Sequence, residues 1–299
     1  MKKSVLKCLA FLAVSLFFSC STSSGFTELL SVAGEVAGAT GHGKTAAGLN
    51  AAASASRAME EITPENEYYI GRAVAATLLS NYKVYNPAAK EAYLNRICRV
   101  ITVNSAVPEL FNGYHVKILD SNEVNAFATS GGHIFLTMGL LNCLDSEDAV
   151  AAAIAHEVAH IHLQHSLKAI KASRWTAAGV SATSAGVAVA RSNAELATAM
   201  NDMVGDIVGD LVNNGYSQKQ EFEADALAVT LLSDAGYNAS AMLDMLSMIQ
   251  KQGGKSGGMF NTHPSPDKRI QNVSSSVKSH PASSKAGTEA RYARFVKTK

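Results

Sequence analysis

Hydrophobic residues recur at helical spacing over most of this chain and at strand spacing over one interval near its middle. Apolar positions three and four residues apart predict helices over 64–81, 87–105, 146–172, 217–232 and 239–252. Alternating apolar and polar positions predict three short strands between the second and third helices, at 115–119, 124–128 and 133–138. Aromatic residues are 7% of the chain and small residues are many, which favours closely packed helices over a β-sandwich. The pattern therefore predicts an α+β fold that is mainly helical with a small sheet.

Polar residues and glycines stand where these elements begin or turn. Asp145 is expected to cap the long third helix, with Asp148 at the position of a capping-box acid. Ser130-Gly131-Gly132 predicts the turn between the second and third strands. The periodic region extends over residues 61–275, which we predict to form one domain. The Ser- and Lys-rich residues 276–299 predict a loose C-terminal tail.

The N-terminus has the organisation of an export signal. Lysines precede an apolar run from Cys8 to Phe18, which has the length of a signal-peptide core and is too short to span a membrane. The run ends at Ser19-Cys20-Ser21, and a small residue followed by cysteine is typical of a bacterial lipoprotein cleavage site. We expect residues 1–19 to be removed and Cys20 to be lipidated, with ordinary secretion and a spare cysteine as the alternative. Either way the protein is exported to the periplasmic side of a bacterial membrane, and Ser21 favours the outer membrane.

Residues 20–60, rich in Gly, Ala, Ser and Thr, predict a flexible spacer between this anchor and the domain. Within them, Gly38 to Thr45 matches the phosphate-binding pattern G-x-x-x-x-G-K-T. That motif works only between a buried strand and a helix of a parallel sheet, and the short segment after Cys20 leaves no room for such a sheet. We therefore expect no nucleotide binding.

Charge and cysteine content narrow the picture further. Lys plus Arg is 26 and Asp plus Glu is 25, a balance that gives no support to nucleic-acid binding. Cys98 and Cys143 remain in the domain after removal of the signal. In an oxidising compartment such a pair favours a disulfide, with two free buried thiols as the alternative.

The long third helix carries His156-Glu157-Val158-Ala159-His160. His156 and His160 lie four residues apart and project from the same face of a helix. Two imidazoles so placed can bind one zinc ion, and Glu157 can reach a water molecule on that ion. The bare motif also occurs by chance in long chains, so a further ligand elsewhere is needed to support the zinc site.

A second cluster supplies that ligand. Glu221 and Asp225 are four residues apart on the predicted helix 217–232, so both lie on one face. Glu221 is expected to bind zinc while Asp225 hydrogen-bonds a ligand histidine, and Glu223 should face away. A solvated acidic face is the alternative, but the apolar residues around Glu221 favour a partly buried helix.

Together these segments resemble metallopeptidase family forty-eight, which includes the HtpX-type proteases and the CAAX prenyl endopeptidases. The likeness covers roughly residues 60–275. It is closest to secreted or lipid-anchored bacterial members, because this chain lacks the several membrane spans of the HtpX and prenyl-endopeptidase branches. The chain departs from the family pattern at Gln218, where relatives often carry Arg. The matching segments are His156 to His160, Glu221 to Asp225, Asn125-Ala126-Phe127-Ala128 with Gly131-Gly132, and His263-Pro264 with Arg269.

The resemblance implies a zincin fold of the gluzincin type, in which a small antiparallel sheet packs on two metal-bearing helices. It implies a zinc-dependent endopeptidase with one ion per chain, acting on misfolded or unassembled envelope proteins in quality control. It also implies that a substrate peptide lies as an added strand along the sheet edge. The residues expected to contact that peptide are Asn125, Ala126, Phe127, Ala128, His133, Ile134 and Phe135.

Roles for the remaining residues follow from the same chemistry. Glu157 is expected to take a proton from the attacking water and pass it to the leaving amine. His263 is expected either to support the oxyanion or to occupy the open zinc position and keep the enzyme latent. Arg269 is expected to order the C-terminal segment or a carboxylate and not to react, and His162 and His165 are expected to pack at the surface or around the ligands. The alternative function is a non-catalytic periplasmic chaperone or assembly factor on a zinc-protease fold, which the intact Glu157 disfavours.

Overall fold

The computed structural model describes residues 23–41, 62–169, 215–252, 262–263, 266–280 and 288–295, with isolated positions at 43–53 and 205–209. The chain forms two compact units, residues 1–61 with 171–192 and residues 62–170 with 193–299. Two of these predictions lie outside the described residues: the signal peptide at 1–19 and lipidation of Cys20. The small-residue segment 176–212, for which the sequence predicts a pair of loosely packed helices, also lies almost entirely outside them.

The first unit contains helix α2 (Ser23–Ala39), which lies in the segment expected to be a flexible spacer. The expected flexibility is therefore wrong for these residues, while their place between an anchor and the domain stays a prediction. Leucine, alanine and glutamate, which favour helix, are interspersed there with the small residues that suggested a linker.

The second unit contains the predicted sheet with one additional strand. Its four strands are β1 (Val84–Tyr85), β2 (His115–Leu119), β3 (Ala126–Thr129) and β4 (His133–Thr137), in the order β1-β2-β4-β3. β3 and β4 form the expected antiparallel hairpin, and Gly131 and Gly132 adopt φ angles of +75° and +95° in its turn. β4 lies between β3 and β2 and runs parallel to β2. The sheet is therefore mixed, and the expectation of a purely antiparallel sheet is wrong.

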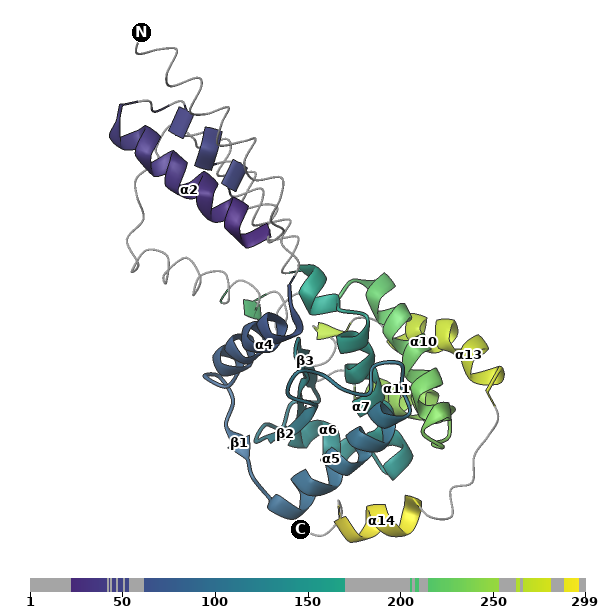
Figure 1. Cartoon of the computed structure of the whole chain (residues 1–299). Coiled ribbons are helices and arrows are strands. Elements are labelled where there is room, and N and C mark those ends of the chain that lie inside the picture. The colour runs from purple at the N-terminus through teal and green to yellow at the C-terminus, as the bar shows by residue number, and fades with distance from the viewer. Residues whose placement is uncertain are drawn as a thin grey trace. The chain divides into compact units, whose positions relative to one another are not determined.

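The helices of this unit carry the motif residues and cover the sheet (Figure 1). Those at 64–81, 87–105, 217–232 and 239–252 are confirmed with ends shifted by a few residues. Thr63 and Ser217 cap two of them as their side chains accept amide hydrogen bonds. The helices are α4 (Pro64–Leu78), α5 (Ala88–Val103), α6 (Met138–Cys143), α7 (Glu147–His162), α10 (Gln218–Asp234), α11 (Ala241–Gln252), α13 (Pro266–Lys278) and α14 (Thr288–Phe295).

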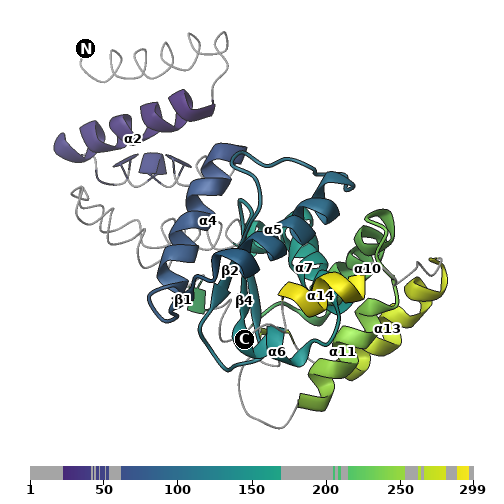
Figure 2. The same cartoon turned by 90° about the horizontal axis from the view of Figure 1, so that it is seen from below.

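Helix α7 runs through the middle of the second unit, between α5 and α10 (Figure 2). Every residue from Glu147 to Ile161 is buried. Its many alanines allow neighbouring helices and β3 to approach closely on all sides, so the helix has no solvent face. A motif carried on this helix is therefore held in the core of the unit.

Both ends of α7 differ from the prediction. Ser146, and not Asp145, is the N-cap, because its side chain accepts the amide of Ala149 at 3.2 Å. α7 ends at His162, so the predicted continuous helix is interrupted there, and helical conformation resumes over residues 165–169. Gln164 follows in a left-handed conformation with φ of +54°, although no glycine or proline announces the break.

The C-terminal segment is ordered where a loose tail was expected. α13 continues to Lys278, and α14 packs against α5 and α7. Tyr292 of α14 is buried and its hydroxyl donates to the carbonyl of Leu144. The tail prediction is therefore wrong for residues 276–278 and 288–295.

Cys98 and Cys143 are free thiols, so the predicted disulfide between them is wrong. Cys98 points from α5 into the main core while Cys143 ends α6. Burial raises the pKa of the Cys98 thiol to about 12 and that of Cys143 to about 11, so both stay protonated at neutral pH.

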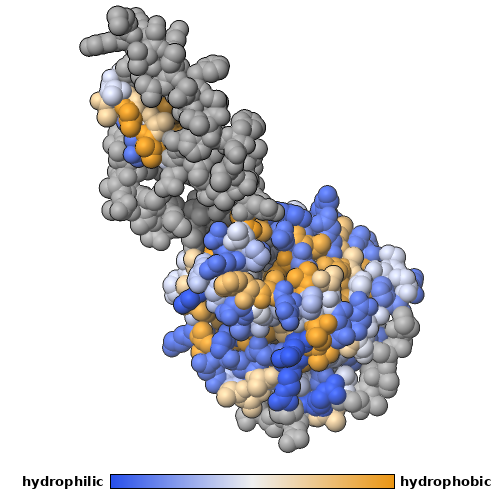
Figure 3. Space-filling view, in the orientation of Figure 1, coloured by the Kyte–Doolittle hydropathy of each residue, from blue (hydrophilic) through white to orange (hydrophobic). Residues whose placement is uncertain are grey.

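Among the described residues, none of the helices has both the length and the hydropathy required to cross a bilayer. Hydrophilic residues cover much of the face of the second unit shown in Figure 3, with hydrophobic residues between them. Among the large hydrophobic residues left exposed are Tyr69 and Phe111.

Candidate metal centre

The structure brings four potential ligands together in the core. His156 and His160 come from α7, Glu221 from the first turn of α10, and His263 from the segment before α13. One donor atom from each lies within 4.8 Å of all the others, and all four residues are buried. The predicted set of His156, His160 and Glu221 is thus assembled, and His263 joins it.

The spacing of these atoms suits a small tetrahedral cation. The Nε2 atoms of His156 and His160 are 3.1 Å apart, and Nδ1 of His263 lies 3.3 Å from Nε2 of His156. Glu221 Oε1 lies 3.4 Å from Nε2 of His160 and 2.9 Å from Nδ1 of His263. Ligands at about 2.0–2.1 Å from a tetrahedral zinc ion are separated by roughly 3.3–3.4 Å. Two nitrogens, a carboxylate and a third nitrogen are also the donor types that zinc prefers.

The electrostatics of the cluster favour a positive charge at its centre. Burial and Arg269 lower the pKa of His156, but hydrogen bonds to Asp225 and Glu221 outweigh them and raise it to about 9. Burial raises the pKa of Glu221, yet His263 and Arg269 outweigh it and hold that pKa well below its usual range. The carboxylates around His156 therefore favour a positive charge there, and a bound cation satisfies the same carboxylates.

Arg269 of α13 binds the carboxylates beside the ligand cluster. Its guanidinium donates to both oxygens of Asp225, at 2.8 and 2.6 Å, and Nη1 lies 3.0 Å from Oε2 of Glu221. Asp225 in turn lies 3.0 Å from Nδ1 of His156, which is the predicted carboxylate–histidine contact. The expectation that Arg269 orders a carboxylate agrees with this geometry.

Glu157 stands beside the four ligands without joining them. It is fully buried, and neither carboxylate oxygen has a hydrogen-bond partner among the described residues. The nearest cation-forming group is His263, whose Nε2 lies 3.7 Å from Oε1. Burial raises the pKa of Glu157, although His263 and His156 oppose this. A buried carboxylate with free lone pairs fits a group that awaits a ligand or water.

Two further side chains touch the cluster, and the motif alone did not identify their contacts. The ring of Tyr216 stacks on that of His160 with centroids 4.0 Å apart. Nδ1 of His165 lies 2.9 Å from Nδ1 of His160, which agrees with packing around the ligands. His162 instead contacts the hydroxyl of Tyr114 at 2.9 Å, away from the cluster. An aromatic residue directly before the cap Ser217 was the only sequence signal for Tyr216.

The residues expected to contact substrate lie at the β3 edge and its neighbour β4, but most of their side chains point into the core. Phe127 and Phe135 pack in a hydrophobic cluster with α4, and Ile134 lies in the main core. Only the backbone of β3 is therefore placed to pair with an added strand. Asn125, just before β3, accepts a 3.0 Å hydrogen bond from Thr262, the neighbour of His263.

The far end of this edge is covered. Thr129 donates to the carbonyl of Gly71 at 3.0 Å, and a Cβ on Gly71 would lie 1.6 Å from the carbonyl oxygen of Ser130. α4 thus crosses the hairpin in direct backbone contact. His133 lies at this covered end and packs on Tyr68, so a role for it in substrate contact stays a prediction.

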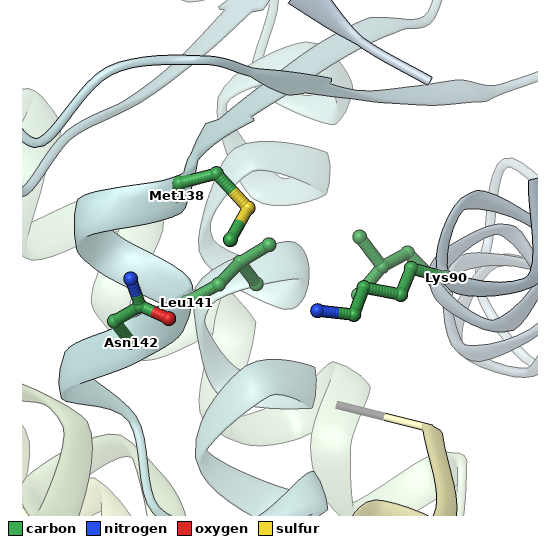
Figure 4. Close-up of a pocket in the computed structure, with 5 residues that line it drawn as sticks. Lys90, Met138, Leu141 and Asn142 are labelled. Atoms are coloured by element: carbon green, nitrogen blue, oxygen red, sulfur yellow. The ribbon is translucent and has the colours of Figure 1, made fainter. Parts of the chain in front are cut away.

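A separate pocket lies between α5 and α6 (Figure 4). Lys90 and Leu141 point toward each other across it, and Met138 and Asn142 line one side. None of its lining residues is an acid or a histidine, so this pocket does not extend the metal centre.

A mixed sheet packed on a buried His-Glu-x-x-His helix, with a carboxylate ligand on a second helix, defines a zincin-type metallopeptidase. In agreement, residues 88–277 match peptidase family M48, and the chain belongs to this family of zinc-dependent metallopeptidases. The resemblance found in the motif residues is thereby confirmed, as are the zincin-like fold and the zinc cofactor.

Individual relatives are similar over the same region. The metalloproteases LoiP and YcaL of Escherichia coli are 31% and 30% identical, over 58% of this chain and 68% and 67% of their own lengths. The β-barrel assembly-enhancing protease of Yersinia pestis is 24% identical over 79% of this chain and 48% of its own length. The chain thus spans between a third and about half of the length of the assembly-enhancing proteases that it matches.

Proposed function

We propose that this protein is a zinc-dependent endopeptidase that hydrolyses misfolded or unassembled proteins of the bacterial envelope. The observation that carries the proposal is the buried cluster of His156, His160 and Glu221, with the unpartnered carboxylate of Glu157 beside it. The names of the relatives, which include proteases that enhance β-barrel assembly, support the choice of substrate class.

The residues divide the chemistry as follows. His156, His160 and Glu221 hold the ion, and Asp225 orients His156 through its Nδ1 atom. Bound zinc would supply Lewis-acid polarisation of the scissile carbonyl and lower the pKa of a water molecule from about 15.7 towards about 7. Glu157 accepts a proton from the attacking water and delivers it to the leaving nitrogen. Burial raises the pKa of Glu157, which favours its acceptance of that proton.

His263 is proposed to keep the enzyme latent. Its Nδ1 atom occupies the fourth donor position, 2.9 Å from Glu221 Oε1, where a substrate carbonyl or water would otherwise bind. The adjacent Thr262 is tied to Asn125 at the start of the edge strand. Both contacts support a segment that a peptide must displace before it can be cleaved.

Cleavage of casein and of an unfolded outer-membrane protein tests the enzyme. We expect Glu157→Gln to abolish cleavage while it keeps a full complement of zinc, because the variant lacks the proton acceptor but retains all ligands. Identical behaviour of the variant and the wild type, with both cleaving or both only preventing aggregation, would contradict a zinc peptidase whose base is Glu157. Identical prevention of aggregation without cleavage would favour the non-catalytic chaperone.

The same assay decides the role of His263. Latency predicts that His263→Ala raises the cleavage rate several-fold, since the fourth position is then open. A fall in the rate would instead assign His263 to stabilisation of the oxyanion.

We further propose that the mature chain begins at a lipidated Cys20 and is anchored on the periplasmic side of the outer membrane. The apolar run before Ser19-Cys20-Ser21 supports this proposal. Mass spectrometry of protein purified from membranes is expected to show an acylated N-terminal cysteine. An unmodified N-terminus in soluble periplasmic protein would contradict the anchor but not the enzyme.

A further inference from the structure

The two zinc-facing histidines of α7 are held from behind in different ways. His156 presents Nδ1 to the buried carboxylate of Asp225, which also pairs with Arg269. His160 presents Nδ1 to a second imidazole, that of His165, at 2.9 Å. His165 continues to Glu223, since its Nε2 lies 3.4 Å from Oε2 of that carboxylate.

The proton positions along this second chain follow from the role of His160. Because Nε2 of His160 faces the other ligand atoms, its single ring proton must be on Nδ1 when an ion is bound. Nδ1 of His165 then has to accept that proton, which leaves the proton of His165 on Nε2, directed at Glu223. If Nδ1 of His165 also carried a proton, that proton would face the proton on Nδ1 of His160, and the two nitrogens are only 2.9 Å apart. Only the neutral Nε2–H form of His165 satisfies all three groups.

The backbone is bent to allow this contact. Five residues along a continuous helix, His165 would lie about 140° around the axis from His160 and could not reach its Nδ1 atom. α7 instead ends at His162, and Gln164 adopts φ of +54°, the only positive φ of a non-glycine residue in the described parts of the chain. Such a conformation costs roughly 1–2 kcal/mol. It returns the chain so that His165 is fully buried against His160.

We propose that His165 is a positioning residue that, together with Glu223, fixes the tautomer and ring orientation of His160 for metal binding. This inference rests on the proposed zinc site. The carboxylate of Glu223 lies on α10, two residues beyond Glu221, so the same helix supplies both the ligand and the end of the relay. Its side chain is 41% exposed, whereas Asp225 is buried, so one ligand histidine is oriented from the core and the other from near the surface.

Zinc affinity of the full mature chain, measured by competition with a chromophoric chelator, tests the proposal. Asparagine places an oxygen where Nδ1 of histidine stood, and leucine has a similar size without an acceptor. We expect His165→Leu to weaken zinc binding about 10–100-fold, the usual effect of losing an outer partner of a ligand histidine. His165→Asn should stay within a few-fold of the wild type, and Glu223→Ala should fall between the two.

His162→Leu is the matched control, because His162 lies at the same helix end but contacts Tyr114. It should leave zinc affinity unchanged. A second measurement needs no variant: ¹⁵N NMR of the zinc-bound wild type should show His165 protonated at Nε2 and not at Nδ1. This readout keeps the test valid even if His165→Leu fails to fold.

Three results would overturn the inference. Equal losses in the leucine and asparagine variants would indicate packing alone, unchanged affinity in both would indicate no role, and an Nδ1-protonated His165 would exclude the relay. In each case the wild type still binds zinc, so the proposed function survives. A wild type that binds no zinc would instead refute the proposed function, and the relay with it.

Discussion

At the scale of single residues, the centre depends on a buried cation that is not itself a ligand. Arg269 forms a two-pronged pair with Asp225 and contacts Glu221, so one guanidinium stabilises two carboxylates in the core. Burial lowers the pKa of Arg269 less than these carboxylates raise it, so it stays charged. The same pairing outweighs the effect of burial on Asp225 and lowers its pKa to about 2.

Removal of this charge should therefore destabilise the fold as well as the site. We expect Arg269→Met to lower the free energy of unfolding of the zinc-free protein by about 3–5 kcal/mol, since it leaves Asp225 and Glu221 buried without their partner. Urea unfolding measures this loss. The exposed Arg96 of α5 provides a control, because Arg96→Met should change the free energy by less than about 0.5 kcal/mol. Equal effects of the two substitutions would mean that Arg269 is dispensable for stability.

The residue pairs that could be predicted are those set by helical spacing. His156 with His160 and Glu221 with Asp225 share a helix face whatever the rest of the fold does. The contact between His160 and His165 could not be predicted in this way, because it depends on a helix break at Gln164 that no glycine or proline marks. The stacking of Tyr216 likewise depends on how the chain enters α10.

At the scale of elements, the first turn of the metal-bearing helix is held by the C-terminal helix. Glu147 at the start of α7 is buried, and the hydroxyls of Tyr93 and Tyr237 donate to it. Arg291 of α14 lies 2.5 Å from the same carboxylate. α14, with its buried Tyr292, thus covers the N-terminus of α7, the helix that carries His156 and His160.

Loss of this packing should be measurable. We expect Tyr292→Ala to lower the free energy of unfolding by about 3 kcal/mol, because a buried ring is replaced by a cavity. Hydrogen exchange should show faster opening of the first turn of α7 in the same variant. Tyr69→Ala, at a residue that is half exposed, should cost much less. If both variants lose the same small amount, α14 is not docked in solution.

Elements with strong local signals were predicted well. α4, α5, α10 and α11 have apolar faces at helical period, and Thr63 and Ser217 satisfy free amides at the starts of α4 and α10. α14 was missed because its residues are mostly polar and its helix is supported by docking of Tyr292 against Leu144, between α6 and α7. The start of α7 was predicted one residue too early. Asp145 and Ser146 are both residue types that cap helices, and Ser146 is the N-cap in the structure.

At the scale of the whole molecule, the order of the strands determines which strand lies at the edge of the sheet. β3 is an edge strand because β4 turns back between it and β2, and the start of β3 lies beside the segment of His263. Alternation along the chain identified the strands but not this order, since pairing joins residues far apart in the sequence. The side chains of Phe127, Ile134 and Phe135 turned out to build the core and not a binding surface.

The sequence by itself determined the chemistry of this protein: the zinc motif, its acidic partner on a second helix, the turn of the hairpin and the family. These follow from residue types and from spacings of four residues or fewer, which a helix or a turn converts directly into position. Only the tertiary structure decided the mixed sheet, the free cysteines, the docking of α14, the fourth donor His263 and the contact of His165 with His160. The first four depend on packing between segments far apart in the sequence, whereas the contact of His165 with His160 depends on the local backbone reversal at Gln164.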